Sequence, residues 1–264
     1  MSTVTGFGAL ETHLRARRDA GRKLLVPYVT GGLGADWPEV VRAFADGGAD
    51  AIEIGIPFSD PVMDGPTIQE ASEAALREGA NLGAILDALR GVDAGVPLVV
   101  MTYVNLVFRN GYERFAAEAV AAGVNGVILP DLPMEELDEW EPTATEAGME
   151  TVLLASPLTP DDRLAVLCER SRGFVYGVNL LGVTGERTSV AQMSIDLAKR
   201  LKATTDRPAI MGFGISTPDQ ARAAAEHSDG VVVASALMRR RLDGASPEEL
   251  GEDVAALRAA LDAG

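Results

Sequence analysis

Glu53 is a carboxylate inside a run, Ala51–Gly55, that otherwise has the composition of a buried strand. Successive side chains of a strand point to opposite faces, so Ile52 and Ile54 share one face and Glu53 takes the other. In a barrel, the isoleucines would face the surrounding helices and Glu53 the interior. A carboxyl group there loses hydration, so its pKa rises and it can deliver a proton near neutral pH. The alternative is a structural carboxylate held by a buried Arg or by backbone amides.

Two more carboxylates follow in the turn-rich stretch Ser59–Pro66. Asp64 belongs to the loop that leaves the strand of Glu53, in wetter surroundings. Two carboxylates in different surroundings can take different protonation states and divide acid and base work. Asp64 precedes a Gly-Pro pair, so a turn-forming role is its alternative. For Asp60, which precedes a proline, we prefer the structural role, because Asp commonly caps its own turn at such a position.

Other residue types that often carry catalysis are poorly placed. His13 falls within an expected helix and His227 at the end of another, both away from the expected reactive face. Cys168 is the only cysteine, which excludes an intramolecular disulfide and a multi-cysteine metal site. With no H-E-x-x-H motif either, we expect no metal site. No lysine falls at the end of an expected strand, which disfavours an aldolase that forms a covalent imine.

Small-residue turns follow the last three expected strands, at Gly182–Gly185, Gly212–Ser216 and Ala234–Ala236. Backbone amides of such turns, with the start of a short extra helix near Ser235, can hold a phosphate without a strong cationic side chain. Barrels often bind phosphate beside the loops after their seventh and eighth strands. The alternative is that the glycines only permit tight turns. The composition of Gly182 to Thr188 also suits a lid that excludes water.

The elements that must position these groups alternate along the chain as short apolar runs and amphipathic stretches, which predicts βαβ units. The expected strands are eight: Leu24–Thr30, Ala51–Gly55, Leu98–Tyr103, Gly126–Leu129, Thr151–Ala155, Gly173–Gly177, Ala209–Phe213 and Gly230–Ala234. The expected helices between and after them are Pro38–Asp46, Ile68–Glu78, Gly111–Ala122, Met134–Ala147, Pro160–Glu169, Val190–Ala203, Pro218–His227 and Pro247–Leu261. Three helix starts carry a hydroxyl before a proline, at Thr159, Thr217 and Ser246.

This order predicts an α/β fold, a single (β/α)8 TIM barrel in which residues 1–264 form one domain. A chain of 264 residues with 47% hydrophobic content is close to the roughly 250 residues of such a barrel. An extra N-terminal helix, Gly8–Asp19, could plug the N-terminal mouth. The opposite mouth is then free for chemistry, because the loops leaving the C-terminal strand ends build the active site in this fold.

The net charge and the distribution of apolar residues limit the possible binding partners and the cellular compartment of the protein. The net charge of −16 disfavours nucleic acid and anionic membrane surfaces. No apolar stretch reaches roughly 18 residues, and Met1 to Glu11 lacks the features of a signal peptide. We therefore expect a cytoplasmic protein that acts on a small molecule.

Taken together, the stretches Glu53–Gln69, Pro130–Pro133, Gly182–Gly185 and Gly212–Ser216 resemble the tryptophan synthase alpha subunit family. The resemblance extends from about Leu24 to Arg239. Its first motif is long and specific, whereas the glycine turns alone would suit many phosphate-binding barrels. The resemblance implies a carbon–carbon lyase of tryptophan biosynthesis that cleaves indole-3-glycerol phosphate to indole and glyceraldehyde 3-phosphate. It also implies that Glu53 acts as acid and base, and that Asp64 pairs with the indole N–H.

The resemblance implies further substrate contacts. Residues that match positions around the indole are Tyr28, Thr30, Met101 and Leu129, and Tyr176 matches a tyrosine beside the catalytic glutamate. Thr184 matches a lid threonine that meets the loop aspartate, while Gly185, Gly214, Ala234 and Ser235 match the phosphate-binding turns. Apart from the tyrosine hydroxyls, the contacts around the indole could be plain barrel packing. The chain departs from the family pattern at Asn179–Leu181 and at Ala234, where glycine is common, which leaves lid motion and phosphate affinity open.

The resemblance also implies a partner, a beta subunit in an alpha2beta2 complex, that docks on the loop Pro57 to Gly65 and near Asn105. The cofactor pyridoxal phosphate would belong to that partner, and none is expected in this chain. For Asn105 the alternative is a loop-capping amide. Two other functions remain open: a stand-alone indole-3-glycerol phosphate lyase that needs no partner, and a non-catalytic barrel that binds a phosphorylated ligand and only regulates a partner.

Overall fold

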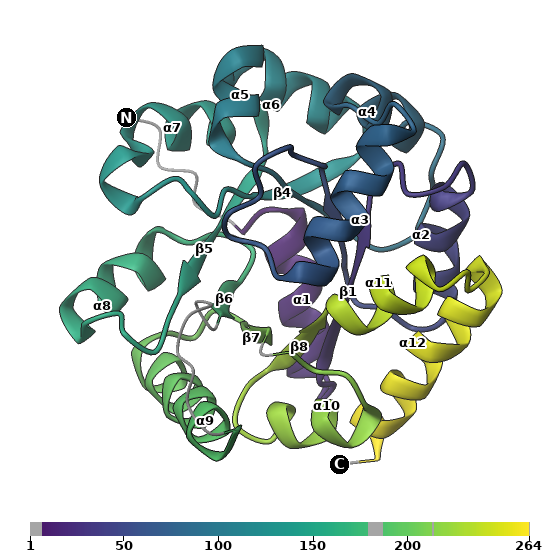
Figure 1. The fold of residues 1–264 in the computed structure, drawn as a ribbon. Coiled ribbons are helices and arrows are strands. Elements are labelled where there is room, and N and C mark those ends of the chain that lie inside the picture. Colours follow the sequence, from purple (N-terminus) through teal and green to yellow (C-terminus); the bar gives the residue numbers. More distant parts are fainter. Residues whose placement is uncertain (1–6, 179–186, 213, 264) are drawn as a thin grey trace.

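Eight parallel strands form a closed barrel in which each strand pairs with its neighbours in sequence and β1 closes on β8. The computed structural model describes residues 7–178, 187–212 and 214–263. The strands are β1 Leu24–Thr30, β2 Ile52–Gly55, β3 Leu98–Met101, β4 Val124–Ile128, β5 Glu150–Ala155, β6 Val175–Val178, β7 Ala209–Gly212 and β8 Gly230–Val233. Helices surround them in a ring (Figure 1). The fold expected from the alternating pattern is confirmed.

Most helices lie on the outside of the barrel, whereas α1 lies across one of its mouths (Figure 1). The helices are α1 Ala9–Asp19, α2 Trp37–Asp46, α3 Pro66–Arg77, α4 Leu82–Leu89, α5 Val104–Asn110, α6 Tyr112–Ala121, α7 Leu137–Ala147, α8 Asp161–Arg170, α9 Arg187–Thr204, α10 Pro218–Ala225, α11 Ser235–Leu242 and α12 Pro247–Asp262, with a 3-10 turn at Met134–Glu136. The additions to the expected set are α4 and α5, whereas α11 matches the short helix expected near Ser235.

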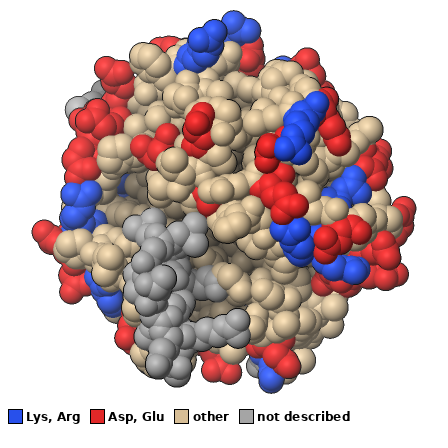
Figure 2. Space-filling model, viewed as in Figure 1, with Lys and Arg blue, Asp and Glu red and all other residues tan. Residues whose placement is uncertain are grey.

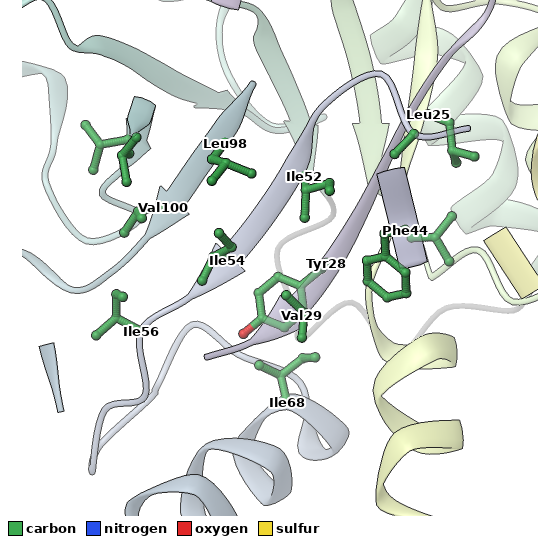
Figure 3. Close-up of a cluster of buried hydrophobic side chains, with 14 of the residues drawn as sticks. Leu25, Tyr28, Val29, Phe44, Ile52, Ile54, Ile56, Ile68, Leu98 and Val100 are labelled. Atoms are coloured by element: carbon green, nitrogen blue, oxygen red, sulfur yellow. The ribbon is translucent and has the colours of Figure 1, made fainter. Parts of the chain in front are cut away.

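Two apolar layers follow the alternation of the strands. Ile52 and Ile54 of β2 pack with Leu98 of β3 and Phe44 of α2 in the outer layer, between strands and helices (Figure 3). The inner layer consists of residues at alternate positions, among them Val99, Ile128, Val152 and Ile210. Glu53 lies between the two isoleucines and therefore faces the inner layer, as the period of two predicts.

Helix α1 closes the N-terminal mouth of the barrel. Leu10 and Leu14 are fully buried and belong to the inner layer. A Cβ atom on Gly126 or Gly173 would lie within 2.8 Å of the Leu10 side chain, so these glycines make room for the plug. The Glu150 carboxylate accepts hydrogen bonds from the first backbone amides of α1, including Leu10 N at 2.7 Å. Chemistry is therefore confined to the other mouth.

Local signals set several boundaries, with two corrections. Thr217 accepts from Gln220 N and Ser246 forms a capping box with Glu249, as expected. Thr159 does not cap its helix: α8 begins at Asp161, and the Thr159 hydroxyl accepts from Ser156 N instead. The third strand is shorter than expected, because it ends at Met101 and Tyr103 becomes the residue that precedes α5.

Candidate active site

Glu53 is buried in the barrel interior with 2% of its surface exposed. Its Oε2 atom has no hydrogen-bond partner among the described residues. Burial, and secondarily the charge of Asp64, raise the pKa of Glu53 to about 8. An acid with that pKa is protonated at neutral pH and can give up its proton. No cation contributes to this shift, so the ion pair considered as an alternative finds no support in the described residues.

Two tyrosines share the interior with Glu53. Tyr28 on β1 is paired in register with Glu53 on β2, and its hydroxyl reaches over Gly55. Tyr176 on β6 reaches in the same way over Gly212 of β7. A Cβ atom at either glycine would overlap the phenol ring, so both glycines are required by close approach. Burial, with the charges of Glu53 and Asp64 adding to it, raises the pKa of both tyrosines, which therefore remain protonated.

Asp64 is partly buried on the loop between β2 and α3, and burial raises its pKa while one hydrogen bond opposes the rise. That bond comes from Tyr103, whose hydroxyl donates to Asp64 Oδ2 at 3.1 Å. Gln69 in the first turn of α3 donates to the Asp64 carbonyl at 2.9 Å. Asp60 is exposed, and its carboxylate accepts from the neighbouring Ser59 hydroxyl at 2.6 Å. Of the two loop carboxylates, only Asp64 contributes to the raised pKa of Glu53.

The sequence pattern predicts that Tyr103 ends a strand and indicates no role for it. Its position could have indicated a role, because it is an aromatic residue with a hydroxyl at a C-terminal strand end, where barrels place their reactive groups. Its partner on the loop is 39 residues away in sequence, and only the closed barrel brings the two together.

A pocket of about 260 Å³ with a mixed apolar and polar lining, which includes Arg163, opens at the C-terminal ends of β4, β5 and β6. Neither carboxylate lines it, but Met63, the residue before Asp64, does. Its lining includes Met63 from the β2–α3 loop, Leu129, Leu154 and Val178. Of the residues that the resemblance places around the indole, Leu129 lines this pocket, and Met101 packs against the inner layer. Thr30 is buried, and its hydroxyl lies 3.4 Å from the Tyr28 hydroxyl.

The structure describes only some residues of the turns that are expected to bind phosphate. Gly214 takes a left-handed conformation with φ of +65°, and a Cβ there would meet open space. Ala234 is the N-cap of α11 without a side-chain hydrogen bond, and Ser235 begins the helix and is exposed. The first turn of α11 therefore has free amides and the positive end of a helix dipole. Thr184 and Gly185, with Asn179–Leu181, lie outside the described residues.

Lys23 and Lys202 lie away from this site. Lys23 donates to the Ser228 carbonyl and Lys202 pairs with Asp229, both at the N-terminal side of the strands. In the described part of the chain no group of three His, Cys, Asp or Glu side chains is arranged to hold a metal ion. Within the same part, no helix is long and apolar enough to cross a membrane.

Comparison with known proteins agrees with this geometry. The family model described as tryptophan synthase alpha chain matches residues 14–260. The chain belongs to this family. The tryptophan synthase alpha chain of Streptomyces coelicolor is 43% identical, covering 97% of this chain and 96% of the relative. That of Geobacter sulfurreducens is 45% identical, covering 91% and 92%.

Solved structures of the family share the whole fold. Tryptophan synthase subunit alpha from Legionella pneumophila superposes with a TM-score of 0.87 at 31% identity, covering 98% of this chain and 100% of that one. A chain of tryptophan synthase from M. tuberculosis gives 0.87 at 35% identity, covering 96% and 99%. As a tryptophan synthase alpha chain family member, the protein is a carbon–carbon lyase that cleaves indole-3-glycerol phosphate in tryptophan biosynthesis.

Proposed function

We propose that the barrel performs this cleavage as a retro-aldol reaction with Glu53 as the group that moves the proton. The observation that carries the proposal is a carboxyl group in the barrel interior, without a hydrogen-bond partner at Oε2 and with a pKa of about 8. Such a group is neutral at working pH and close to its own titration, which suits one residue that serves first as acid and then as base.

The proton balance closes on Glu53. It protonates C3 of the indole ring, which gives an indoleninium cation. The resulting carboxylate then removes the proton of the side-chain hydroxyl next to the bond that breaks, the electron pair of that carbon–carbon bond returns to the ring, and indole and glyceraldehyde 3-phosphate form. Glu53 ends protonated, as it began. The Asp64 carboxylate accepts from the ring N–H and stabilises the positive charge that grows there.

The ring and the phosphate take separate places in this proposal. The indole ring lies between Glu53 and Leu129, which lines the pocket described above, and it also contacts Tyr28, Thr30, Met101 and Tyr176. The phosphate lies on the amides of Gly185, Gly214, Ala234 and Ser235, at the N-terminus of α11, and Thr184 contacts Asp64 when substrate is bound. Backbone amides at a helix N-terminus can bind an anion without a lysine or arginine side chain in the site.

We expect Ser235→Asp to weaken substrate binding by roughly 10-fold or more while the fold survives, because it puts a negative charge at the start of α11 where the phosphate would lie. The side chain of Ser235 is exposed, so the substitution removes no packing. Affinity for glycerol phosphate, measured by calorimetry, tests this. Ala84→Asp, also exposed in the first turn of a helix (α4) but outside the proposed site, is the control for a general charge effect. Unchanged affinity in Ser235→Asp would place the phosphate elsewhere.

We also propose that a tryptophan synthase beta subunit docks on the loop Pro57 to Gly65 and near Asn105, and that this partner holds the pyridoxal phosphate. Supporting this, Val62 on the loop is 79% exposed and Phe108 on α5, three residues after Asn105, is 71% exposed. Both are large apolar side chains that a partner would remove from water. Acidic side chains are spread over this view of the molecule, and basic ones lie mostly toward its periphery (Figure 2).

One assay tests the function and separates the alternatives. Purified protein is incubated with indole-3-glycerol phosphate, alone and with a beta subunit, and indole is measured. We expect indole in both cases and a higher rate with the partner, because docking orders the Asp64 loop. An equal rate would favour the stand-alone lyase, and binding without turnover would favour the regulatory barrel.

We also propose that the protein acts in the cytoplasm and that residues 1–264 form one domain.

A further inference from the structure

The hydroxyl of Tyr103 bridges two consecutive residues of the β2–α3 loop. It accepts a hydrogen bond from Met63 N at 2.9 Å and donates to Asp64 Oδ2 at 3.1 Å. A phenol has a single proton, and the amide of Met63 already occupies a lone pair of the oxygen. The proton of Tyr103 is therefore directed at the carboxylate. Burial raises the pKa of Tyr103 above its usual value, so the hydroxyl stays a donor.

Tyr103 itself is anchored in the barrel as well as contacting the loop. It is 5% exposed and directly precedes α5. The next residue, Val104, donates its backbone N–H to Asp131 Oδ1 at 2.8 Å, which ties the start of α5 to the loop after β4. On the side of the β2–α3 loop the ring contacts Phe58, with centroids 4.8 Å apart. Tyr103 therefore connects the strand ends of β3 and β4 to the loop, which lacks regular structure, and can orient Asp64 there.

We infer that Tyr103 is a positioning residue for the cleavage reaction, which holds the Asp64 carboxylate in the orientation that receives the N–H of the indole ring. Two directed hydrogen bonds fix both the backbone before Asp64 and one carboxylate oxygen. The second oxygen, Oδ1, is left to face the ring nitrogen.

The inference rests on the proposed role of Asp64, and a double-mutant cycle keeps the two apart. Tyr103→Phe keeps the ring and its packing and removes only the hydroxyl. We expect kcat to fall by roughly 10-fold in the wild-type background, the size expected for one charge-assisted hydrogen bond. In an Asp64→Asn background the same substitution should change kcat by less than about twofold, because its target is gone.

A binding measurement supplies a readout that a merely structural role would not move. The probes are indole-3-propanol phosphate, which keeps the ring N–H, and its benzofuran counterpart, in which oxygen replaces the N–H. In Tyr103→Phe, we expect the Kd of the indole probe to rise and that of the benzofuran probe to stay unchanged. Tyr112→Phe, on α6 and without a hydrogen bond to the loop, is the matched control and should behave as wild type in both measurements.

The outcomes separate cleanly. Equal losses for both probes, or a full additional loss in the Asp64→Asn background, would show that the hydroxyl only stabilises the fold. A normal kcat in Tyr103→Phe with a defective Asp64→Asn would overturn the inference and leave the proposed function standing. A normal kcat in Asp64→Asn would overturn the role of Asp64 on which both rest. Melting temperatures, recorded for all variants, report on folding.

Discussion

Glu53→Gln should lower kcat by roughly 10²- to 10⁴-fold, toward the upper end, because one residue then fails both as acid and as base. Gln keeps the size and polarity of the side chain but exchanges no proton at working pH. Affinity for an unreactive substrate analogue should remain near wild type, because the phosphate and ring contacts are elsewhere. Single-turnover rates and analogue affinity, measured on the same preparation, test this.

The stability of this variant distinguishes the catalytic role from the ion-pair alternative. The pKa of Glu53 is raised from 4.5 to about 8 by folding, so between these values the native protein binds the proton more tightly than the unfolded chain. The contribution of Glu53 to stability is therefore present at low pH and lost as pH rises toward and through 8. Glu53→Gln removes this dependence, and its melting temperature near pH 8 should equal or exceed that of wild type. A buried ion pair would instead give a large decrease.

Glu150→Gln is the matched control for Glu53→Gln. Glu150 is also a buried strand glutamate, but it lies at the opposite mouth and accepts hydrogen bonds from the α1 amides. We expect it to lose stability and to keep kcat per folded molecule. If Glu150→Gln lost activity as Glu53→Gln does, loss of any buried carboxylate would explain both, and the assignment of Glu53 would fail.

Asp64→Asn should lower kcat by roughly 10²- to 10³-fold, the range found when one preorganised electrostatic group is removed from a reacting centre. The amide oxygen can still accept from the ring N–H, so substrate binding should change little. The charge that offsets the indoleninium cation is lost, and the penalty falls on the transition state. The measurement is kcat and KM for indole-3-glycerol phosphate with the chain alone.

Asp60→Asn is the control for this loop. Asp60 precedes Asp64 by four residues, is exposed and pairs only with the hydroxyl of Ser59 among the described residues. Its kcat should lie within about twofold of wild type in the absence of a partner. A comparable loss in Asp60→Asn would mean that loop conformation, and not the charge at Asp64, limits the reaction.

The sequence predicted the barrel because each of its signals is local. Apolar runs rich in Val and Ile alternate with amphipathic stretches, and hydroxyls at Thr217 and Ser246 cap their helices through contacts only three residues away. The orientation of Glu53 follows in the same way, since a period of two places it opposite Ile52 and Ile54. These features depend on backbone geometry that any parallel barrel shares.

The tertiary structure alone decided what surrounds the two carboxylates. Nothing near Glu53 in sequence shows that its Oε2 atom finds no partner, because that depends on side chains from other strands. The sequence pattern predicts a strand that ends at Tyr103, whereas barrel closure makes this residue the hydrogen-bond donor to Asp64, 39 residues away in sequence. Local pattern specifies the elements, whereas hydration and hydrogen-bond partners depend on distant segments, so the pKa values and the positioning of Asp64 emerge only when the barrel closes.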